Sequence, residues 1–273
     1  MDAGSSGGGS RTLSRGLTVL SALGTDPEGL TVAQLADRTG LDRAVLYRLL
    51  TTLCEEGLAV RDNDSLRFRL GVALVALGAG AARGLPVRRH ARPGMRALME
   101  QCREAVCLAV RDRDHAVVVD RVEPPGRSAR IGYHVGLRHP LDRGAHGKAV
   151  LGSLEDGDPA LAAFESASPE LPNGYAVAEG DLEGGIVGVA APIREADGTV
   201  AASVGIVAPA TRLPDAGALG PSVRALADEV SRRLADGESR AGSAARRTEH
   251  AGDGAGDGRG TGNAAVPVRP RQT

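Results

Sequence analysis

The chain of 273 residues is long enough for two modest domains, and its 42% hydrophobic content supports a core although only 2% of the residues are aromatic. Its three cysteines form no metal or disulfide pattern, and the sequence has no signal peptide or membrane span, which predicts the reducing cytoplasm rather than secretion. The formal net charge is −1, yet residues 11–92 hold twelve arginines against eight acidic residues, a distribution typical of a DNA-binding domain joined to one that does not bind DNA.

Two helices joined by a tight turn are predicted in the first part of the chain. Thr31 and Gln34 have the spacing of a capping box, in which each side chain satisfies a backbone N–H group of the other. Gly40 suits the left-handed end of that first helix. Asp42 is a good N-cap for a second helix over residues 43–56. This arrangement predicts a helix-turn-helix.

The second helix has two different faces. We expect one face to pack in the core because leucines recur on it at helical spacing: Leu46, Leu49, Leu50 and Leu53. We expect the other face to enter the major groove of duplex DNA, and it consists of Arg43, Ala44, Tyr47, Arg48 and Thr51. Arg43 and Ala44 lie in the first turn, where arginine can bind guanine and alanine can contact a thymine methyl group. A solvated arginine and a Tyr47 packed beside the wing are the alternatives.

A basic hairpin follows the second helix. Residues 58–61 and 66–70 are predicted strands around the turn at residues 62–65. In the second strand Leu66, Phe68 and Leu70 alternate with Arg67 and Arg69, so that one face should pack while the other carries two guanidinium groups. Arg67 and Arg69 are therefore predicted to contact DNA phosphates. Helix, turn, helix and hairpin together make a winged helix-turn-helix.

An apolar linker helix and a second domain complete the predicted fold, which is α+β. A longer helix is predicted at residues 85–104, before the second domain. That domain should have strands in the middle and helices outside, with strands at residues 106–110, 116–119, 129–135, 186–192 and 200–207 and helices at residues 147–154 and 214–234. The predicted boundaries are a disordered N-terminus at 1–10, a DNA-binding domain at 11–71, a linker helix at 72–90, a second domain at 91–235 and a disordered tail at 236–273.

The sequence resembles the IclR family of bacterial transcription regulators over roughly residues 12–235. The resemblance in the first domain rests on Arg15-Gly16-Leu17, Tyr47-Arg48-Leu49-Leu50, Glu56-Gly57 and Phe68-Arg69-Leu70-Gly71. In the second domain it rests on Gly136, Pro140-Leu141, Gly147-Lys148-Ala149-Val150-Leu151, Gly174-Tyr175-Ala176, Ala190-Ala191-Pro192-Ile193 and Asp197-Gly198. It implies a GAF-like effector-binding domain that holds a small molecule, and a linker helix that contributes to dimerisation.

The resemblance also implies an effector site near the start of the helix around residue 147. The candidate residues are Gly144, Ala145, His146, Gly147 and Lys148, of which Lys148 is the only lysine of the chain. Backbone N–H groups in this segment suit an anion, whereas a salt-bridged or helix-capping Lys148 is the structural alternative. Family members that bind small oxoacids place Asp, Cys and Ser groups at positions matched here by Ala178, Gly188, Gly205 and Val207. We therefore expect an effector that is larger or more apolar than a small oxoacid, or a degenerate pocket.

No enzyme, metal site or cofactor is predicted. The sequence lacks a Gly-x-Ser-x-Gly elbow, a P-loop and a His-Glu-x-x-His motif, and the spacing of His134, His139 and His146 fits no standard zinc pattern. The function that fits best is a homodimeric or tetrameric regulator in the bacterial cytoplasm, which binds a pseudo-palindromic DNA operator under the control of a small-molecule effector. The alternatives are a winged-helix module that binds protein, an enzyme with an appended helix-turn-helix, and a regulator whose sensor domain binds no ligand.

Overall fold

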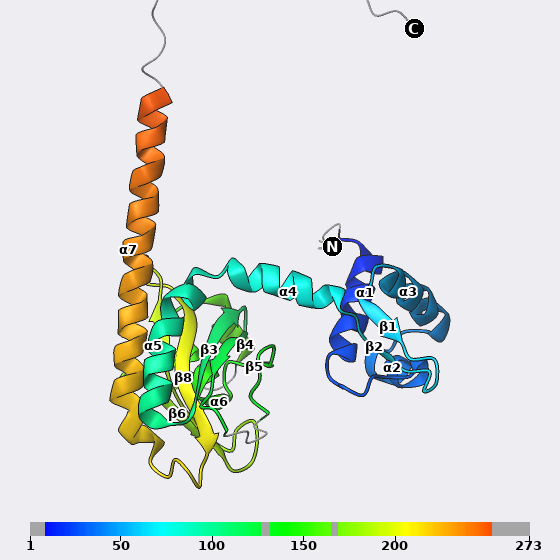
Figure 1. Ribbon diagram of the computed structural model, residues 1–273, viewed down its shortest axis with the longest axis horizontal. Coiled ribbons are helices and arrows are strands. Elements are labelled where there is room, and N and C mark those ends of the chain that lie inside the picture. Colours follow the sequence, from blue (N-terminus) through cyan, green and yellow to red (C-terminus); the bar gives the residue numbers. More distant parts are fainter. Residues whose placement is uncertain (1–8, 127–131, 165–168, 253–273) are drawn as a thin grey trace, which may run out of the picture. The chain divides into compact units, whose positions relative to one another are not determined.

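The structure is a computed structural model that describes residues 9–126, 132–164 and 169–252, with side chains described up to residue 237 (Figure 1). The chain divides into two compact units, Met1–Pro86 and Val87–Thr273, each with a core of its own. Among the described residues, no helix is both long enough and apolar enough to cross a membrane.

The first unit packs three helices against a two-stranded antiparallel sheet. Its elements are α1 (Arg11–Leu23), α2 (Val32–Thr39), α3 (Arg43–Glu55), β1 (Ala59–Arg61), β2 (Phe68–Leu70) and α4 (Ala73–Arg83). Aliphatic side chains from all three packed helices meet one aromatic ring from the sheet in the core: Val19, Leu23, Leu35, Leu46, Leu50, Leu53 and Phe68. The predicted core face of α3 is thus confirmed, with Leu49 half-buried at its edge. This packing fixes the opposite face of α3 toward solvent.

The helix ends in this unit follow the local signals of the sequence. The Thr31 hydroxyl accepts from Gln34 N at 3.3 Å, and Gln34 Oε1 accepts from Thr31 N at 2.9 Å, which completes the predicted capping box. Gly40 has a φ of 67°, in the left-handed region, and its N–H donates to Ala36 O. Asp42 caps α3 by accepting from Ala44 N at 2.8 Å. These bonds satisfy backbone groups that a helix end leaves without partners.

The wing is shorter than predicted, and its alternation is incomplete. β1 and β2 have three residues each, in the register Ala59 opposite Leu70 and Arg61 opposite Phe68. Phe68 is buried as predicted, but Leu66 is 54% exposed and Leu70 is 42% exposed. Leu66 has a φ of 55°, so it belongs to the turn rather than to the strand. Within β2 only Phe68 is buried.

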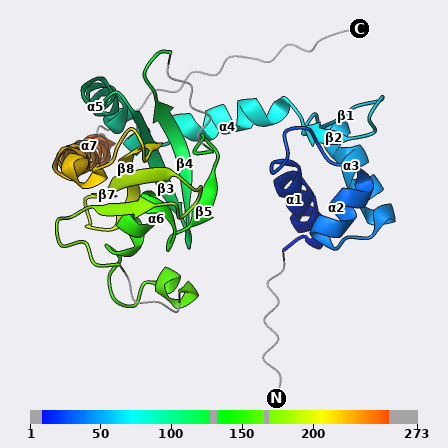
Figure 2. The same ribbon diagram turned by 90° about the horizontal axis from the view of Figure 1, so that it is seen from below.

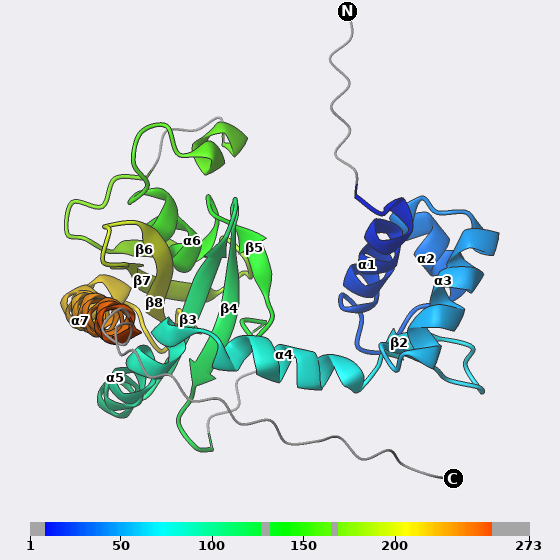
Figure 3. The same cartoon turned by 90° about the horizontal axis from the view of Figure 1, so that it is seen from above.

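The second unit is an antiparallel six-stranded sheet with helices on both faces. Its strand order is β5-β4-β3-β8-β7-β6. The helices α5 and α7 lie side by side on one face and α6 lies on the other, as Figures 2 and 3 show. The elements in chain order are α5 (Pro86–Cys102), β3 (Ala105–Asp112), β4 (His115–Val122), β5 (Arg138–Pro140), α6 (Gly144–Leu151), η1 (Pro159–Ala163), β6 (Ala176–Glu179), β7 (Ile186–Arg194), β8 (Val200–Pro209), η2 (Ala216–Leu219) and α7 (Gly220–Gly252). The predicted α+β class is confirmed.

A buried carboxylate ties α5 to the sheet. Asp120 on β4 is only 4% exposed, and both of its oxygens accept from Arg92 of α5 at 2.5 Å. Arg88 of the same helix lies 3.1 Å from Asp120. The guanidinium groups of Arg92 and Arg88 compensate for the hydration that this buried carboxylate loses. The range predicted for the linker, residues 72–90, holds parts of two helices, because α4 ends at Arg83 and α5 begins at Pro86. The helix α5 agrees with the longer helix predicted at residues 85–104.

Several predicted elements of the second unit differ from the structure. The strand expected at residues 129–135 is absent over residues 132–135, while residues 129–131 lie outside the described residues. The strands β5 and β6 were not predicted, because they are short and carry few β-branched residues. The final helix continues to Gly252, into the range predicted as a disordered tail from residue 236. Residues 236–252 contain four alanines, three arginines and two glutamates, which favour helix, together with three glycines, which do not.

Replacing Thr31 by alanine removes the hydroxyl that caps α2 and should cost about 1 kcal/mol of local stability. In the full chain we expect hydrogen exchange of the α2 amides to accelerate roughly fivefold, since about 1.4 kcal/mol corresponds to a factor of ten. Thr52→Ala is the matched control, because Thr52 is exposed on α3 and its hydroxyl contacts only the Arg48 carbonyl at 3.4 Å. Unaltered α2 exchange in Thr31→Ala would contradict the role of the cap.

Candidate functional site

The outward face of α3 presents exposed cationic side chains. Ala44, Tyr47 and Thr51 are exposed on it, as are Arg43 and Arg48. Among the described residues, neither guanidinium group has an ion pair or a hydrogen bond, although the Arg48 carbonyl accepts from the Thr52 hydroxyl. The Thr51 hydroxyl donates to Tyr47 O at 2.9 Å, so that its own helix already uses it. The five residues predicted for this face therefore share one exposed surface, held rigidly by the leucines on the other side.

The two arginines of the wing that were predicted to contact phosphates already contact other residues of the chain. Arg67 is half-buried, and its Nη1 donates to Gly29 O at 2.7 Å and to Gln34 Oε1 at 3.4 Å. Arg67 thereby ties the wing to the capping box of α2. Arg69 forms an ion pair with Asp62 at 3.0 Å, and its side chain remains 46% exposed. A phosphate contact by either arginine stays a prediction, but Arg67 also has a structural role that its spacing did not indicate.

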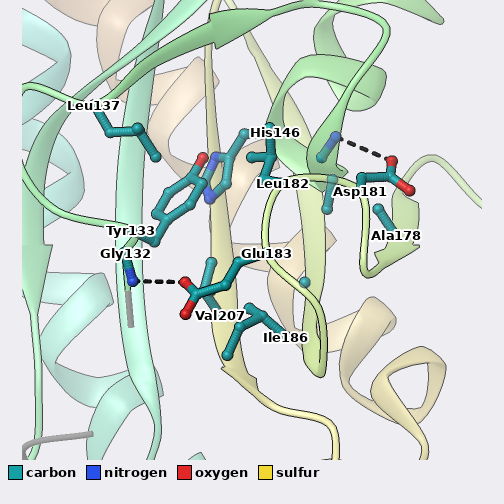
Figure 4. A pocket seen from close by; sticks show the side chains of 13 residues that line it. Gly132, Tyr133, Leu137, His146, Ala178, Asp181, Leu182, Glu183, Ile186 and Val207 are labelled. Atoms are coloured by element: carbon teal, nitrogen blue, oxygen red, sulfur yellow. Dashed lines mark hydrogen bonds between the residues drawn. The ribbon is translucent and has the colours of Figure 1, made fainter. Parts of the chain in front are cut away.

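The second unit contains a pocket of about 100 Å³ between α6, the sheet and the loop that joins β6 to β7 (Figure 4). Tyr133 and His146 lie together in it, and the loop that carries Asp181, Leu182 and Glu183 faces them. We refer to residues 180–185 as the acidic loop. The residues that line the pocket are Gly132, Tyr133, Leu137, Gly144, Ala145, His146, Ala178, Asp181, Leu182, Glu183, Ile186, Gly188 and Val207.

His146 contributes the one buried polar atom of the pocket wall that lacks a partner among the described residues. The side chain is 1% exposed and stacks on Tyr133, with ring centroids 5.4 Å apart. Its Nδ1 lies 3.0 Å from Ser203 Oγ, but its Nε2 has no hydrogen-bond partner. Burial lowers the pKa of His146 to about 3, so the ring is neutral at physiological pH. An orphaned buried nitrogen beside a cavity is a position where a ligand group can bind.

The two carboxylates of the pocket wall hold the acidic loop in place. Asp181 Oδ2 accepts from Gly144 N at 3.1 Å and pairs with Lys148 Nζ at 2.6 Å. Glu183 Oε2 accepts from Gly132 N at 2.7 Å. Burial acts to raise the pKa of Asp181, but the Lys148 ammonium and the Gly144 N–H outweigh it and lower that pKa, which keeps Asp181 ionised.

The structure brings together only part of the predicted effector site. Gly144, Ala145 and His146 line the pocket, whereas Gly147 and Lys148 do not. Gly147 packs against the segment before α6, where a Cβ would lie 2.7 Å from Leu141 O, and Lys148 has the salt bridge that was its alternative interpretation. Of the four positions at which the family resemblance implied polar groups in oxoacid-binding members, three line the pocket: Ala178, Gly188 and Val207. The fourth, Gly205, lies inside the sheet between β3 and β7.

Sequence reasoning missed seven of the thirteen residues of the pocket wall, and three of these seven carry polar side chains: Tyr133, Asp181 and Glu183. Tyr133 precedes β5 in an irregular segment, where its hydroxyl donates to His139 Nε2 at 3.1 Å while His139 Nδ1 donates to Pro140 O at 3.0 Å. Burial raises the pKa of Tyr133, so the phenol stays protonated. The sequence offers one signal for the acidic loop. Asp181, Leu182 and Glu183 lie between Gly180 and the Gly184-Gly185 pair, and such a glycine-rich composition is typical of a turn.

The remaining reactive side chains do not form a site. Burial raises the pKa of the Cys107 thiol to about 12, so Cys107 is an inert core residue. Cys54 packs at the edge of the first core, and burial raises its pKa as well. Within the described ranges, no group of three or more His, Cys, Asp or Glu side chains is arranged to hold a metal ion.

A capped helix-turn-helix with a wing, followed by an α+β unit with a ligand-sized pocket, defines a two-domain transcription regulator. Residues 12–63 match the family described as IclR helix-turn-helix domain, and residues 79–168 and 171–232 match the family described as Bacterial transcriptional regulator IclR C-terminal. The chain belongs to the IclR family. This family comprises regulators of transcription and not enzymes, in agreement with the sequence analysis.

Individual relatives agree with this assignment. The chain is 34% identical over 149 residues to the HTH-type transcriptional regulator TtgV of Pseudomonas putida, a match that covers 55% of the chain and 56% of TtgV, so that the chain spans little more than half the length of that relative. It is 28% identical to the Glycerol operon regulatory protein of Streptomyces griseus over 83% of the chain and 97% of that protein. The fold resembles that of an IclR transcriptional regulator from Alicyclobacillus acidocaldarius, with a TM-score of 0.70 at 24% identity over 84% of the chain and 98% of that structure.

The buried neutral His146 predicts a specific pH dependence. Because its pKa falls from 6.5 to about 3 on folding, the unfolded chain binds a proton that the folded chain does not, and stability decreases as the pH falls from 6.5 toward 3. In His146→Phe this decrease should be smaller, measured by denaturant unfolding of the full chain at several pH values and followed by circular dichroism.

His134→Phe is the matched control for this experiment, because His134 is exposed. The carboxylates titrate alike in both variants, so the difference in slope reports His146. Equal slopes in wild type and His146→Phe would show that the folded chain protonates His146 as easily as the unfolded chain does.

Proposed function

We propose that the chain is a homodimeric, DNA-binding transcriptional regulator whose affinity for its operator responds to a small molecule held in the pocket of the second unit. The observation that carries this proposal is the outward face of α3. Arg43 lies at the start of this helix and Arg48 in its second turn, and neither guanidinium group has a partner among the described residues. The family of the chain supports the same function. A regulator of this kind acts in the cytoplasm, associated with the nucleoid when DNA is bound.

The alternative of a winged-helix module that binds protein explains the arginines less well. An interface with protein favours aromatic and apolar side chains in its centre. On this face Tyr47 is the single aromatic residue, and its neighbours are cationic or small. DNA binding and protein binding also differ in salt dependence. Counterion release makes the affinity for DNA fall steeply as the salt concentration rises.

Replacing Arg48 by alanine should weaken specific binding by roughly 1–3 kcal/mol if the guanidinium contacts a base, or reduce the salt slope by about one if it contacts a phosphate. Binding to the DNA upstream of its own gene, measured by fluorescence anisotropy at several salt concentrations, distinguishes these outcomes. Arg232→Ala is the matched control, since Arg232 is an exposed arginine of the second unit. Wild-type affinity and salt slope in Arg48→Ala would overturn the assignment of α3.

The apolar surface of the first unit supports a homodimer. In the part of the chain that the structure describes, no residue of α4 is buried, although the helix is rich in alanine, valine and leucine. Val72 is 83% exposed, Val75 is 70% exposed and Leu77 is 62% exposed. Leu13 and Leu17, one turn apart on α1, are 63% and 54% exposed. Large apolar side chains this exposed are costly in water and favour burial in a binding interface.

The double variant Val75→Asp with Leu77→Asp should weaken self-association at least tenfold, because dimerisation would bury two carboxylates without partners. Sedimentation equilibrium of the full chain measures the effect. Leu66→Asp introduces one such carboxylate at a 54% exposed leucine of the wing and should leave the dimer intact. A double variant that dimerises as wild type does would exclude α4 from the interface.

Two recognition helices related by a dimer axis fit a pseudo-palindromic operator, with half-site centres roughly 34–36 Å apart in the simplest arrangement. An effector can change DNA binding only by preferring one dimer or tetramer geometry over another. The pocket supports an effector other than a small oxoacid, because the three relevant lining positions are occupied by Ala178, Gly188 and Val207, none of which has a polar side chain.

A further inference from the structure

The acidic loop brings a carboxylate of the chain itself to the point where an anionic ligand would bind. One oxygen of Asp181 receives both the Gly144 N–H at the start of α6, at 3.1 Å, and the Lys148 ammonium, at 2.6 Å. Backbone N–H groups at a helix N-terminus attract anions, and the single lysine of the chain adds a full positive charge there. Both attractive groups are therefore already used by Asp181.

Further contacts fasten the same loop over the pocket. Glu183 accepts from Gly132 N at 2.7 Å, and the Arg143 guanidinium donates to the Asp181 carbonyl. Leu182 lies so close to Gly144 that a Cβ on that glycine would be 2.8 Å from Leu182 Cδ1. Gly180 and Gly185, with φ values of 70° and 75°, allow the chain to turn at both ends of the loop. The loop is thus pinned at both carboxylates and has a glycine at each end.

The remaining pocket wall is unfavourable for a second anion. Among the described residues, no lysine or arginine lines the pocket, and the charged side chains of the wall are Asp181 and Glu183. Lys148 and Arg143 lie outside this wall and contact Asp181. A carboxylate ligand would therefore face two negative charges across an apolar space, and no described residue of the wall offers a free cation to compensate for its desolvation.

The wall does offer one hydrogen-bonding position, at Nε2 of the buried and neutral His146. Since Nδ1 lies 3.0 Å from Ser203 Oγ, the tautomer decides whether Nε2 donates or accepts. A hydroxyl group matches either tautomer because it both donates and accepts. The pocket volume of about 100 Å³ is of the same order as the apolar cavity of about 150 Å³ that holds benzene in another protein.

We propose that Asp181 acts as an internal anion that closes the pocket against carboxylates, so that the pocket selects an uncharged molecule about the size of one six-membered ring, with a hydroxyl group for Nε2 of His146. This inference rests on the proposed function of the pocket as the effector site. It names the chemical class of the effector and the residues that choose it: Asp181, which pairs with Lys148, and His146, which stacks on Tyr133. Figure 4 shows Asp181 on one side of the pocket and His146 with Tyr133 on the other.

Three probes of equal ring size test this selection on the full chain. Isothermal titration calorimetry measures the affinity for benzyl alcohol, toluene and benzoate. We expect benzyl alcohol to bind saturably, toluene to bind several-fold more weakly because it lacks the hydroxyl group, and benzoate to bind at least tenfold more weakly than the alcohol. In His146→Phe the preference for benzyl alcohol over toluene should disappear while toluene affinity persists.

Variants of the acidic loop provide the reverse experiment. Asp181→Ala frees Gly144 N and Lys148, and benzoate affinity should rise at least tenfold. Adding Lys148→Ala should remove most of that gain. Glu179→Ala is the matched control, because Glu179 is an exposed acid two residues before Asp181 that does not line the pocket. Circular dichroism melting of each variant shows that the second unit remains folded.

Wild-type binding of benzoate that equals or exceeds binding of benzyl alcohol would overturn the proposal, as would an Asp181→Ala variant that gains no affinity for benzoate. Absence of binding by all three probes to wild type and to Asp181→Ala would show that this pocket does not hold such a ligand. These titrations contain no DNA. A failure here is therefore distinct from a failure of the proposed function, which the salt-dependent binding of the operator reports.

Discussion

The second unit depends on the close approach of α6 to the sheet, which small side chains make possible. A Cβ on Gly188 of β7 would lie 3.2 Å from the Ala145 Cβ, and a Cβ on Gly147 would lie 2.7 Å from Leu141 O. With only five aromatic residues in the chain, alanine, valine and glycine fill this layer. Because α6 lies so near the strands, its N-terminus opens directly into the pocket, and His146 is enclosed between the sheet and Tyr133. The same small residues leave the pocket wall largely without polar groups.

The first unit could be predicted in detail because its signals are local. The capping box at Thr31, the left-handed Gly40 and the leucine stripe of α3 each depend on residues no more than a few positions apart. The wing was harder to predict, since three-residue strands carry little periodicity. The partner of Arg67 is the carbonyl of Gly29, 38 residues earlier in the chain, and no spacing within the hairpin indicates it.

The pocket was predicted only in part, for the same physical reason. Gly144, Ala145 and His146 were found through resemblance and helix position, but what they face comes from elsewhere in the chain. Asp181 lies 37 residues from Gly144, and Ser203 lies 57 residues from His146. Charge compensation and enclosure are properties of the assembled sheet. The lysine that looked like a ligand-binding residue is in fact neutralised by an aspartate that sequence reasoning did not single out.

The salt bridge of Lys148 has a practical consequence, because the reactivity of the Lys148 amine depends on whether the acidic loop is closed. A chain with a single lysine has one ε-amino group, so an amine-directed label attaches to a side chain at one position only. The Lys148 side chain is 30% exposed, and its amine pairs with the carboxylate of Asp181. This pairing hinders the attack of the amine on electrophiles, whereas opening of the loop would release the amine. The rate at which a label modifies this one nitrogen thus reports how often the loop opens.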